Sequence, residues 1–327
     1  KRPWTVSQVP FGDAAGPLWD FWLRLRRRLS REIASVVGPQ PGLVGRALHY
    51  VIPELTREAR RHPADLYIAH NLAALPAAAR AARQHDALLG FDAEDFHRGE
   101  WPRREEYDIG RRLTVALEER YIPQCDYLTA ASEGIAEAYA QVLDIPCPTP
   151  ILNVFPRLER ETPVPDEALR DEKIDGTVSL YWFSQTIGPH RGLEDVLRAL
   201  PRLPEPVHLY LRGKWADGYE ALFSSEAESL DVAHRVHHLN PVAPPELIPR
   251  TAQHDVGLAL EQPSTSPNRE IAVSNKLFTY LLAGVPFVAS ATKGQQSVCE
   301  DIPEASRLYT SGMPSESGMM PLNPAIA

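Results

Sequence analysis

SNKLFTYLLAGVP, residues 274–286, is the stretch that decides the fold of this chain. It lies between two short apolar runs, residues 255–261 and 286–290, that are typical of buried strands. The pattern predicts a helix that opens with this stretch and carries Lys276 in its first turn. The polar loop before it, residues 262–273, then lies at the carboxyl end of a strand, as in a βαβ unit.

The start of this helix suits an anionic ligand. Its first backbone N–H groups have no partner within the helix and carry a partial positive charge, to which Lys276 adds a full one. Open α/β sheets bind their ligands at the carboxyl ends of the strands. We therefore expect a phosphate or a diphosphate beside Lys276, the ordinary alternative being a solvated surface lysine.

Length and composition limit the class of protein. A chain of 327 residues with 43% hydrophobic residues can form two domains, each with its own core. A net charge of −9 argues against a general nucleic-acid binder. Three cysteines without metal-ligand spacing predict reduced thiols in the cytoplasm, with neither a disulfide framework nor a zinc site. We expect neither a membrane-spanning helix nor a signal peptide.

Strand and helix patterns alternate in two blocks along the chain. Residues 1–150 form the first block, in which one amphipathic helix is predicted over residues 43–61 and another over residues 132–143, with Ser132 as its N-cap. Prolines prevent regular structure through most of residues 151–176, and a second alternation covers residues 177–327. The prediction is an α/β protein with two Rossmann-like, doubly wound domains that face each other across a cleft, where small-molecule sites usually lie.

Several stretches resemble the retaining glycosyltransferases of the GT-B class that use nucleotide sugars, in particular family 4. The matching stretches are residues 184–194, residues 257–261 with Asn268 and Arg269, residues 274–286, and a glycine–glutamine turn at residues 294–296, with weaker agreement at residues 65–71 and 91–97. The resemblance implies transfer of a sugar, with retention of configuration, from a nucleoside-diphosphate sugar in the second domain to an acceptor hydroxyl in the first. Such proteins also begin with a strand and end with a helix, and we expect this chain to lack both elements.

The resemblance also assigns roles on the donor side. Arg191 and Lys276 would bracket the diphosphate, and Gly188 opens a loop that offers backbone N–H groups to it. Because these cations would neutralise the charge that grows on the leaving nucleotide, neither a metal ion nor another cofactor is expected. Glu261 is expected at the reacting centre, with Glu270 as the alternative. The residues expected around the sugar and the nucleotide are Asn268, Arg269, Glu270, Ser274, Asn275 and Thr279.

An acidic segment that follows a predicted strand is the candidate for the acceptor side. Asp92, Glu94 and Asp95 are its candidate catalytic carboxylates, and His97 and Glu100 are candidates for contacts with the acceptor. The alternative is a solvated acidic loop. The acceptor itself could be a glycan, a lipid-linked molecule or a small molecule.

The chain departs from the family pattern at three places. Thr279 stands where many members have a glutamate that binds the ribose, Gln185–Thr186 where many have an arginine, and Glu94 where a histidine is common. Two other functions therefore stay open, a non-catalytic or degenerate nucleotide-sugar-binding protein and a nucleotide-sugar epimerase of the same architecture. A dinucleotide-dependent oxidoreductase is disfavoured because no G-x-G-x-x-G follows a strand.

Apolar side chains recur at helical spacing near the N-terminus, beside a group of arginines. The apolar stripe is Leu18, Trp19, Trp22, Leu25, Leu29, Ile33 and Val36, and the arginines are Arg24, Arg26, Arg27, Arg28 and Arg31. The commoner explanation is an amphipathic helix that packs the stripe on the first domain and leaves the arginines in solvent. The other is a helix over residues 18–36 that lies peripherally on the inner face of an anionic membrane.

Overall fold

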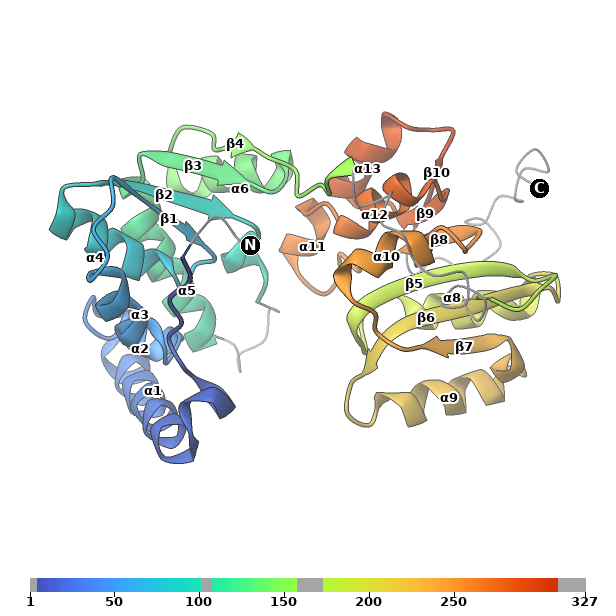
Figure 1. Ribbon diagram of the computed structural model, residues 1–327, viewed down its shortest axis with the longest axis horizontal. Coiled ribbons are helices and arrows are strands. Elements are labelled where there is room, and N and C mark those ends of the chain that lie inside the picture. Colours follow the sequence, from blue (N-terminus) through green and yellow to red (C-terminus); the bar gives the residue numbers. More distant parts are fainter. Residues whose placement is uncertain (1–4, 102–107, 158–172, 311–327) are drawn as a thin grey trace. The chain divides into compact units, whose positions relative to one another are not determined.

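The computed structural model describes residues 5–101, 108–157 and 173–310, which form two compact units. One unit contains the chain up to Leu152 together with Ser266–Asn268, and the other contains Asn153–Thr265 and the chain from Arg269 onward. Each is an α/β unit built on a parallel sheet, as predicted (Figure 1). Much of the proline-rich segment, residues 158–172, and the C-terminal tail, residues 311–327, lie outside the described range.

The first unit has a four-stranded sheet in the order β1-β2-β3-β4, with neighbouring strands parallel. The strands are β1 Leu66–His70, β2 Leu88–Ala93, β3 Tyr127–Ala130 and β4 Thr149–Pro150. The helices are α1 Pro17–Val37, α2 Val44–Leu48, α3 Ile52–Ala59, α4 Leu75–His85, α5 Asp108–Tyr121 and α6 Glu133–Leu143. Ser132 caps α6 as predicted, because its hydroxyl accepts a hydrogen bond from the Ile135 N–H at 3.2 Å.

The single helix predicted over residues 43–61 is wrong, because two helices, α2 and α3, share this segment. His49 adopts an extended backbone conformation, with φ −137° and ψ 131°, and ends α2. Pro53 then lies in the first turn of α3, where its missing N–H costs no helical hydrogen bond. The apolar spacing alone did not reveal the break.

Helix α1 buries a different face from the one expected. It packs against α2 and buries Leu23, Ser30 and Ala34. The predicted apolar stripe is exposed, with 86% of Leu18 and 85% of Val36 accessible, so the expectation that it packs on the first domain is wrong. The physical reason is Arg26.

The guanidinium of Arg26 donates two hydrogen bonds to Glu54, of 2.8 and 2.6 Å, and one to the carbonyl oxygen of Tyr50. A bidentate, partly buried ion pair is stronger than an ordinary surface contact and turns this face inward.

Among the described helices, none combines the length and the apolar character that crossing a membrane requires.

The second unit has a six-stranded parallel sheet in the order β10-β9-β8-β5-β6-β7. The strands are β5 Val178–Ile187, β6 Val207–Trp215, β7 Val236–Leu239, β8 Val256–Ala259, β9 Phe287–Ser290 and β10 Ser306–Tyr309. The helices are α8 Leu193–Ala199, α9 Tyr219–Ser229, α10 Pro244–Thr251, α11 Pro267–Ile271, whose first two residues belong to the first unit, α12 Asn275–Ala283 and α13 Lys293–Glu300. The strand order reverses between β5 and β8, and doubly wound sheets bind ligands at that switch point.

Two buried clusters, one built on each set of alternating β5 side chains, hold this sheet. Leu180 and Trp182 pack in the cluster that includes α8 and α9, whereas Tyr181 packs with Tyr280 of α12. The hydroxyl of Tyr280 lies 3.1 Å from the carbonyl oxygen of Tyr181 and 2.9 Å from that of Leu258, and these two acceptors share its single hydrogen. It therefore ties α12 to both strands of the switch point.

We expect Tyr280→Phe to lower the free energy of unfolding of the second unit by about 1–2 kcal/mol. The substitution removes the hydroxyl that two buried carbonyl oxygens share as a hydrogen-bond donor. Urea denaturation followed by circular dichroism measures the change. Tyr127→Phe, at an exposed position of β3, is the control and should have no effect. An equal change in both variants would contradict the role given to the Tyr280 hydroxyl.

Candidate functional site

Four charged side chains gather at the switch point of the second unit. Glu261 follows β8, and its carboxylate lies 3.4 Å from Nη1 of Arg269 in α11 and 3.8 Å from Nζ of Lys276 in α12. Arg191, in the loop between β5 and α8, acts electrostatically on both Lys276 and Arg269. The cluster thus holds three cations and one anion, and the structure brings together the residues predicted for the diphosphate and for the reacting centre.

A glycine holds the loop that carries Arg191 against the end of β8. Gly192 has φ +76°, in the left-handed region that favours glycine. A Cβ atom there would lie 2.6 Å from Nε2 of Gln262 and 2.9 Å from the carbonyl oxygen of Leu260, so a larger residue would displace the loop. Nη1 of Arg269 donates a hydrogen bond of 3.2 Å to the His190 carbonyl and fixes the loop on its other side.

Lys276 occupies the first turn of α12, as predicted, and only 13% of its side chain is exposed. Its Nζ lies 5.4 Å from the centre of the Trp182 ring and 6.0 Å from that of Phe183, within the range of cation–π attraction. Burial lowers the pKa of Lys276, Arg191 and Arg269 add to this effect, and Glu261 opposes it. Burial and Arg269 likewise lower the pKa of Arg191. A bound anion would relieve this crowding of positive charge.

The other residues predicted for the donor lie in several environments. Gly188 directly follows β5 and is buried, while Ser274 precedes α12 without capping it through its side chain. Asn275 is exposed and Glu270 is half-buried. Thr279 is fully buried, and its hydroxyl donates to the Asn275 carbonyl at 3.3 Å, so it is directed at its own helix.

Gln295 is a positioning residue. It belongs to the stretch 294–296 that carried part of the family resemblance, and these residues form the first turn of α13. The buried Gln295 amide donates to Ser290 at 2.9 Å and to the Ala259 carbonyl at 3.3 Å, which joins the carboxyl ends of β8 and β9. Gly294 permits this approach, since a Cβ atom there would lie 2.4 Å from the Ala272 carbonyl oxygen.

In the first unit, Asp92 and Glu94 lie at the carboxyl end of β2. Asp92 accepts a hydrogen bond of 2.6 Å from Thr129 and lies 2.9 Å from Nδ1 of His70. His70, Asp92 and Glu94 each place one ligand atom within 4.8 Å of the others, so they are the described residues that could hold a metal ion. Such groups of exposed acids are common without one.

Asp95 is bound to Asn268, which belongs to the first unit. Nδ2 of Asn268 donates to Asp95 at 2.7 Å, and its Oδ1 accepts from the Phe96 N–H at 2.8 Å. Burial raises the pKa of Asp95, and the hydrogen bond from Asn268 opposes this rise. The sequence grouped Asn268 with the donor residues, whereas the structure bonds it to Asp95, a residue predicted for the acceptor side.

His97 is a buried imidazole, 5% exposed, whose Nδ1 lies 2.8 Å from Glu100. Burial by itself would lower its pKa, but Glu100, Asp95 and Glu118 outweigh burial and raise it. No hydrogen-bond partner for Nε2 is present in the described part of the chain. This atom is buried, so the unpaired nitrogen faces the interior of the unit and not open solvent.

The two parallel sheets, with a cationic site at the switch point of the second, give the chain the GT-B fold. Among solved structures, it is similar to Anabaena Alr3699/HepE in complex with UDP-glucose, with a TM-score of 0.63, 20% identity, and coverage of 84% of this chain and 71% of that one. It is also similar to a glycosyltransferase from Rickettsia africae, with a TM-score of 0.61, 10% identity, and coverage of 84% and 69%.

A further similar structure is WaaG, a glycosyltransferase involved in lipopolysaccharide biosynthesis, with a TM-score of 0.52, 17% identity, and coverage of 83% and 71%. At such identities the similarity establishes the fold. No protein-family profile matches the chain, and no curated protein matches it.

The raised pKa of His97 predicts a pH dependence of stability. Its contribution to folding should be fully present below about pH 6.5, the value in unfolded chains, and should be lost as the pH rises through the folded pKa. Glu100→Gln should lower the folded pKa, since burial then dominates, and should weaken or reverse this dependence. NMR titration of His97, with urea unfolding at about pH 6 and about pH 8, measures both effects.

Glu137→Gln, on the exposed face of α6, is the matched control and should leave the titration of His97 unchanged. A His97 pKa below that of an unfolded histidine in the unsubstituted protein would contradict the prediction.

Proposed function

We propose that this protein is a family-4-type glycosyltransferase that transfers a sugar from a nucleoside-diphosphate sugar to an acceptor hydroxyl, with retention of configuration and without a metal ion or another cofactor. The carrying observation is the cluster of Arg191, Arg269 and Lys276 around the single carboxylate of Glu261. Three cations and one anion leave two positive charges uncompensated. A diphosphate supplies the opposite charge and the acceptor oxygens that guanidinium and ammonium groups bind.

The same cluster can assist departure of the nucleotide. Negative charge grows on the diphosphate as the glycosidic bond breaks, so cations near it stabilise the transition state more than the bound donor. Lys276 is already held by the Trp182 ring and by Glu261, and it needs little rearrangement when the charge develops. We assign two roles to Glu261. It holds Arg269 and Lys276 in position, and it contacts a hydroxyl of the donor sugar.

Retention follows in this proposal from substitution at the donor face, where the leaving diphosphate guides the incoming acceptor hydroxyl. Glu261 is engaged by two cations, which makes it a poor nucleophile. On the first unit, Asp92, Glu94 and Asp95 would contact the acceptor. His97 would support this side from its buried position, with Glu100 fixing the ring through Nδ1.

A second function, binding of a nucleotide sugar without catalysis, is favoured by one observation. Thr279 occupies the place of the ribose-binding glutamate, and its hydroxyl is buried and bonded to its own helix. The donor ribose then loses a charged partner. Such a protein would bind a nucleotide and leave its sugar donor intact.

We expect one of UDP, GDP and ADP to bind, and Lys276→Ala to weaken that binding by about tenfold or more, because two charge-assisted contacts to phosphate are lost. Calorimetry measures the affinity. Lys214→Ala, at an exposed position of β6 in the same unit, removes the same charge and should have no effect. Absence of binding by all three nucleotides would sink the proposal.

The nucleotide that binds selects the sugar donor for a product assay. Retention predicts that the product, or the sugar released by slow hydrolysis, keeps the anomeric configuration of the donor, as NMR shows directly. Turnover unchanged by EDTA would agree with metal independence. Binding without turnover would favour the non-catalytic alternative, and isomerisation of the donor alone would indicate an epimerase.

We further propose that the protein acts in the cytoplasm with α1 on the inner face of an anionic membrane. The exposed stripe supplies apolar area, and Trp19 and Trp22 stack on each other at 5.1 Å. Beside it, a hollow of about 330 Å³ is lined by Tyr50 and by Arg24, Arg27, Arg28 and Arg31. Apolar residues next to arginines complement a bilayer with anionic headgroups. A lipid-linked acceptor would fit this placement.

Vesicles of phosphatidylcholine with phosphatidylglycerol should therefore sediment the protein, whereas pure phosphatidylcholine should not. The variant Leu29→Glu/Ile33→Glu should abolish sedimentation, because two charges would enter the apolar interface. Leu222→Glu, at a position of α9 that is 70% exposed, is the control. Sedimentation that survives in the double variant would rule out α1 as the contact.

A further inference from the structure

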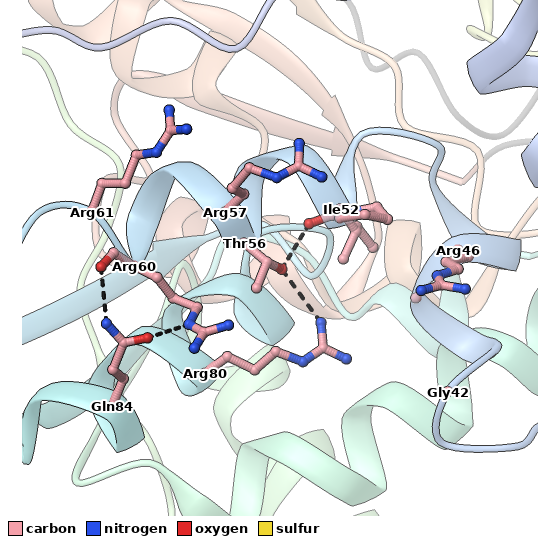
Figure 2. Close-up of a pocket in the computed structure, with 11 residues that line it drawn as sticks. Gly42, Arg46, Ile52, Thr56, Arg57, Arg60, Arg61, Arg80 and Gln84 are labelled. Atoms are coloured by element: carbon pink, nitrogen blue, oxygen red, sulfur yellow. Dashed lines mark hydrogen bonds between the residues drawn. The ribbon is translucent and has the colours of Figure 1, made fainter.

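A second cationic feature lies in the first unit. A pocket of about 550 Å³ is formed between α2, α3 and α4 (Figure 2). Its arginines are Arg46, Arg57, Arg60, Arg61 and Arg80. Within the described part of the chain, no acidic residue lines it.

The pocket is separate from the acceptor-side residues of the same unit. Helix α4 leaves the carboxyl end of β1 and returns toward the amino end of β2, and Arg80 and Gln84 belong to its second half. Arg60 and Arg61 lie shortly before β1 begins at Leu66. The pocket therefore borders the amino ends of the strands, whereas Asp92 lies at the carboxyl end of β2 and His97 follows that end.

Neither acidic residue of α3 lines the pocket. Glu54 is engaged by Arg26 of α1 at 2.6 Å. Glu58 is bound by Arg61 at 3.2 Å and by His62 at 3.0 Å. Of the five pocket arginines, Arg61 alone has a carboxylate partner among the described residues.

The remaining arginines divide into two that are held and two that are free. Nη1 of Arg80 donates to the Thr56 hydroxyl at 3.3 Å, and Arg60 and Gln84 are joined by hydrogen bonds in both directions (Figure 2). Arg46 and Arg57 have neither a hydrogen-bond nor an ion-pair partner in the part of the chain that the structure describes. The pocket thus combines two arginines that hydrogen bonds hold in place, Arg60 and Arg80, with two whose side-chain N–H groups have no partner among the described residues, Arg46 and Arg57.

We propose that this pocket binds a molecule that carries two or more phosphate groups. Guanidinium groups match phosphate oxygens with paired hydrogen bonds, and they keep their charge at any physiological pH. Several arginines without nearby carboxylates create a positive potential that a dianion or a larger anion neutralises. The volume falls within the range of small-molecule sites, and Ile52 and Pro53 supply an apolar wall for the rest of the ligand.

The ligand could be a soluble diphosphate or the diphosphate headgroup of a lipid, since both present the same chemistry. Inorganic pyrophosphate is the soluble probe. To exclude binding at the switch point of the second unit, the parent protein for calorimetry carries Arg191→Gln and Lys276→Ala. This parent should bind one pyrophosphate.

The variant Arg46→Gln/Arg57→Gln, added to this parent, should weaken pyrophosphate binding by about tenfold or more. Neither side chain has a partner in the described structure, so the substitutions remove charge without removing a structural contact. Arg80→Gln serves as a second variant with the same expected direction. Arg83→Gln/Arg120→Gln, outside the pocket but in the same unit, removes the same charge and should leave binding intact.

The lipid source is tested with phosphatidylcholine vesicles that contain either polyprenyl diphosphate or phosphatidylglycerol at equal charge. A lipid ligand predicts stronger sedimentation with the diphosphate lipid, lost in Arg46→Gln/Arg57→Gln. A soluble ligand predicts pyrophosphate binding with no such preference. Failure of both probes to bind, or an equal loss in the Arg83→Gln/Arg120→Gln control, would overturn the proposal, whatever the outcome at the switch point.

Discussion

The pairing of the Glu261 carboxylate with Arg269 and Lys276 is the interaction on which the cationic cluster at the switch point depends. Three cations cannot gather in a partly buried site without a counterion, because desolvation and mutual repulsion both disfavour their charged forms. Glu261 lies within reach of Arg269 and Lys276 and opposes the lowering of the Lys276 pKa. It compensates only part of the positive charge. The cluster can therefore form in the folded protein and still carries a positive charge that an anionic ligand would neutralise.

The topology of the sheet explains why these residues meet. Because the strand order reverses between β5 and β8, the loops after these two strands leave the sheet side by side and in diverging directions. Gly192 allows the first loop to approach Leu260 closely, and Gln295 joins the ends of β8 and β9 behind it. Tyr280 fixes α12 one turn after Lys276. Local geometry therefore converts a general property of doubly wound sheets into a specific constellation of charges.

The sequence predicted most of what depends on local pattern. Lys276 in a first helical turn and Ser132 as an N-cap follow from residue type and spacing, and both are confirmed. The failures depend on contacts between distant residues. The inward face of α1 is set by the pairing of Arg26 with Glu54, which no periodicity reveals, and the burial of Thr279 depends on which face of α12 meets the sheet. The arginine pocket could not be predicted from the sequence for the same reason, since its residues come from three helices and meet only in the fold.

The net charge of −9 and the two cationic sites are compatible because charge acts locally in salt solution. At physiological ionic strength, interactions between exposed charges are screened beyond about 8 Å. A polyanion near either site therefore responds to the side chains around it and hardly to the acidic surplus of the whole chain. Composition rightly argues against an extended polyanion such as a nucleic acid, which needs many basic contacts along its length. It places no limit on compact anions. The chain keeps such sites positive because each holds more cations than carboxylates: Glu54 is engaged outside the pocket by Arg26, Glu58 pairs with only one pocket arginine, and Glu261 is the single carboxylate among three cations.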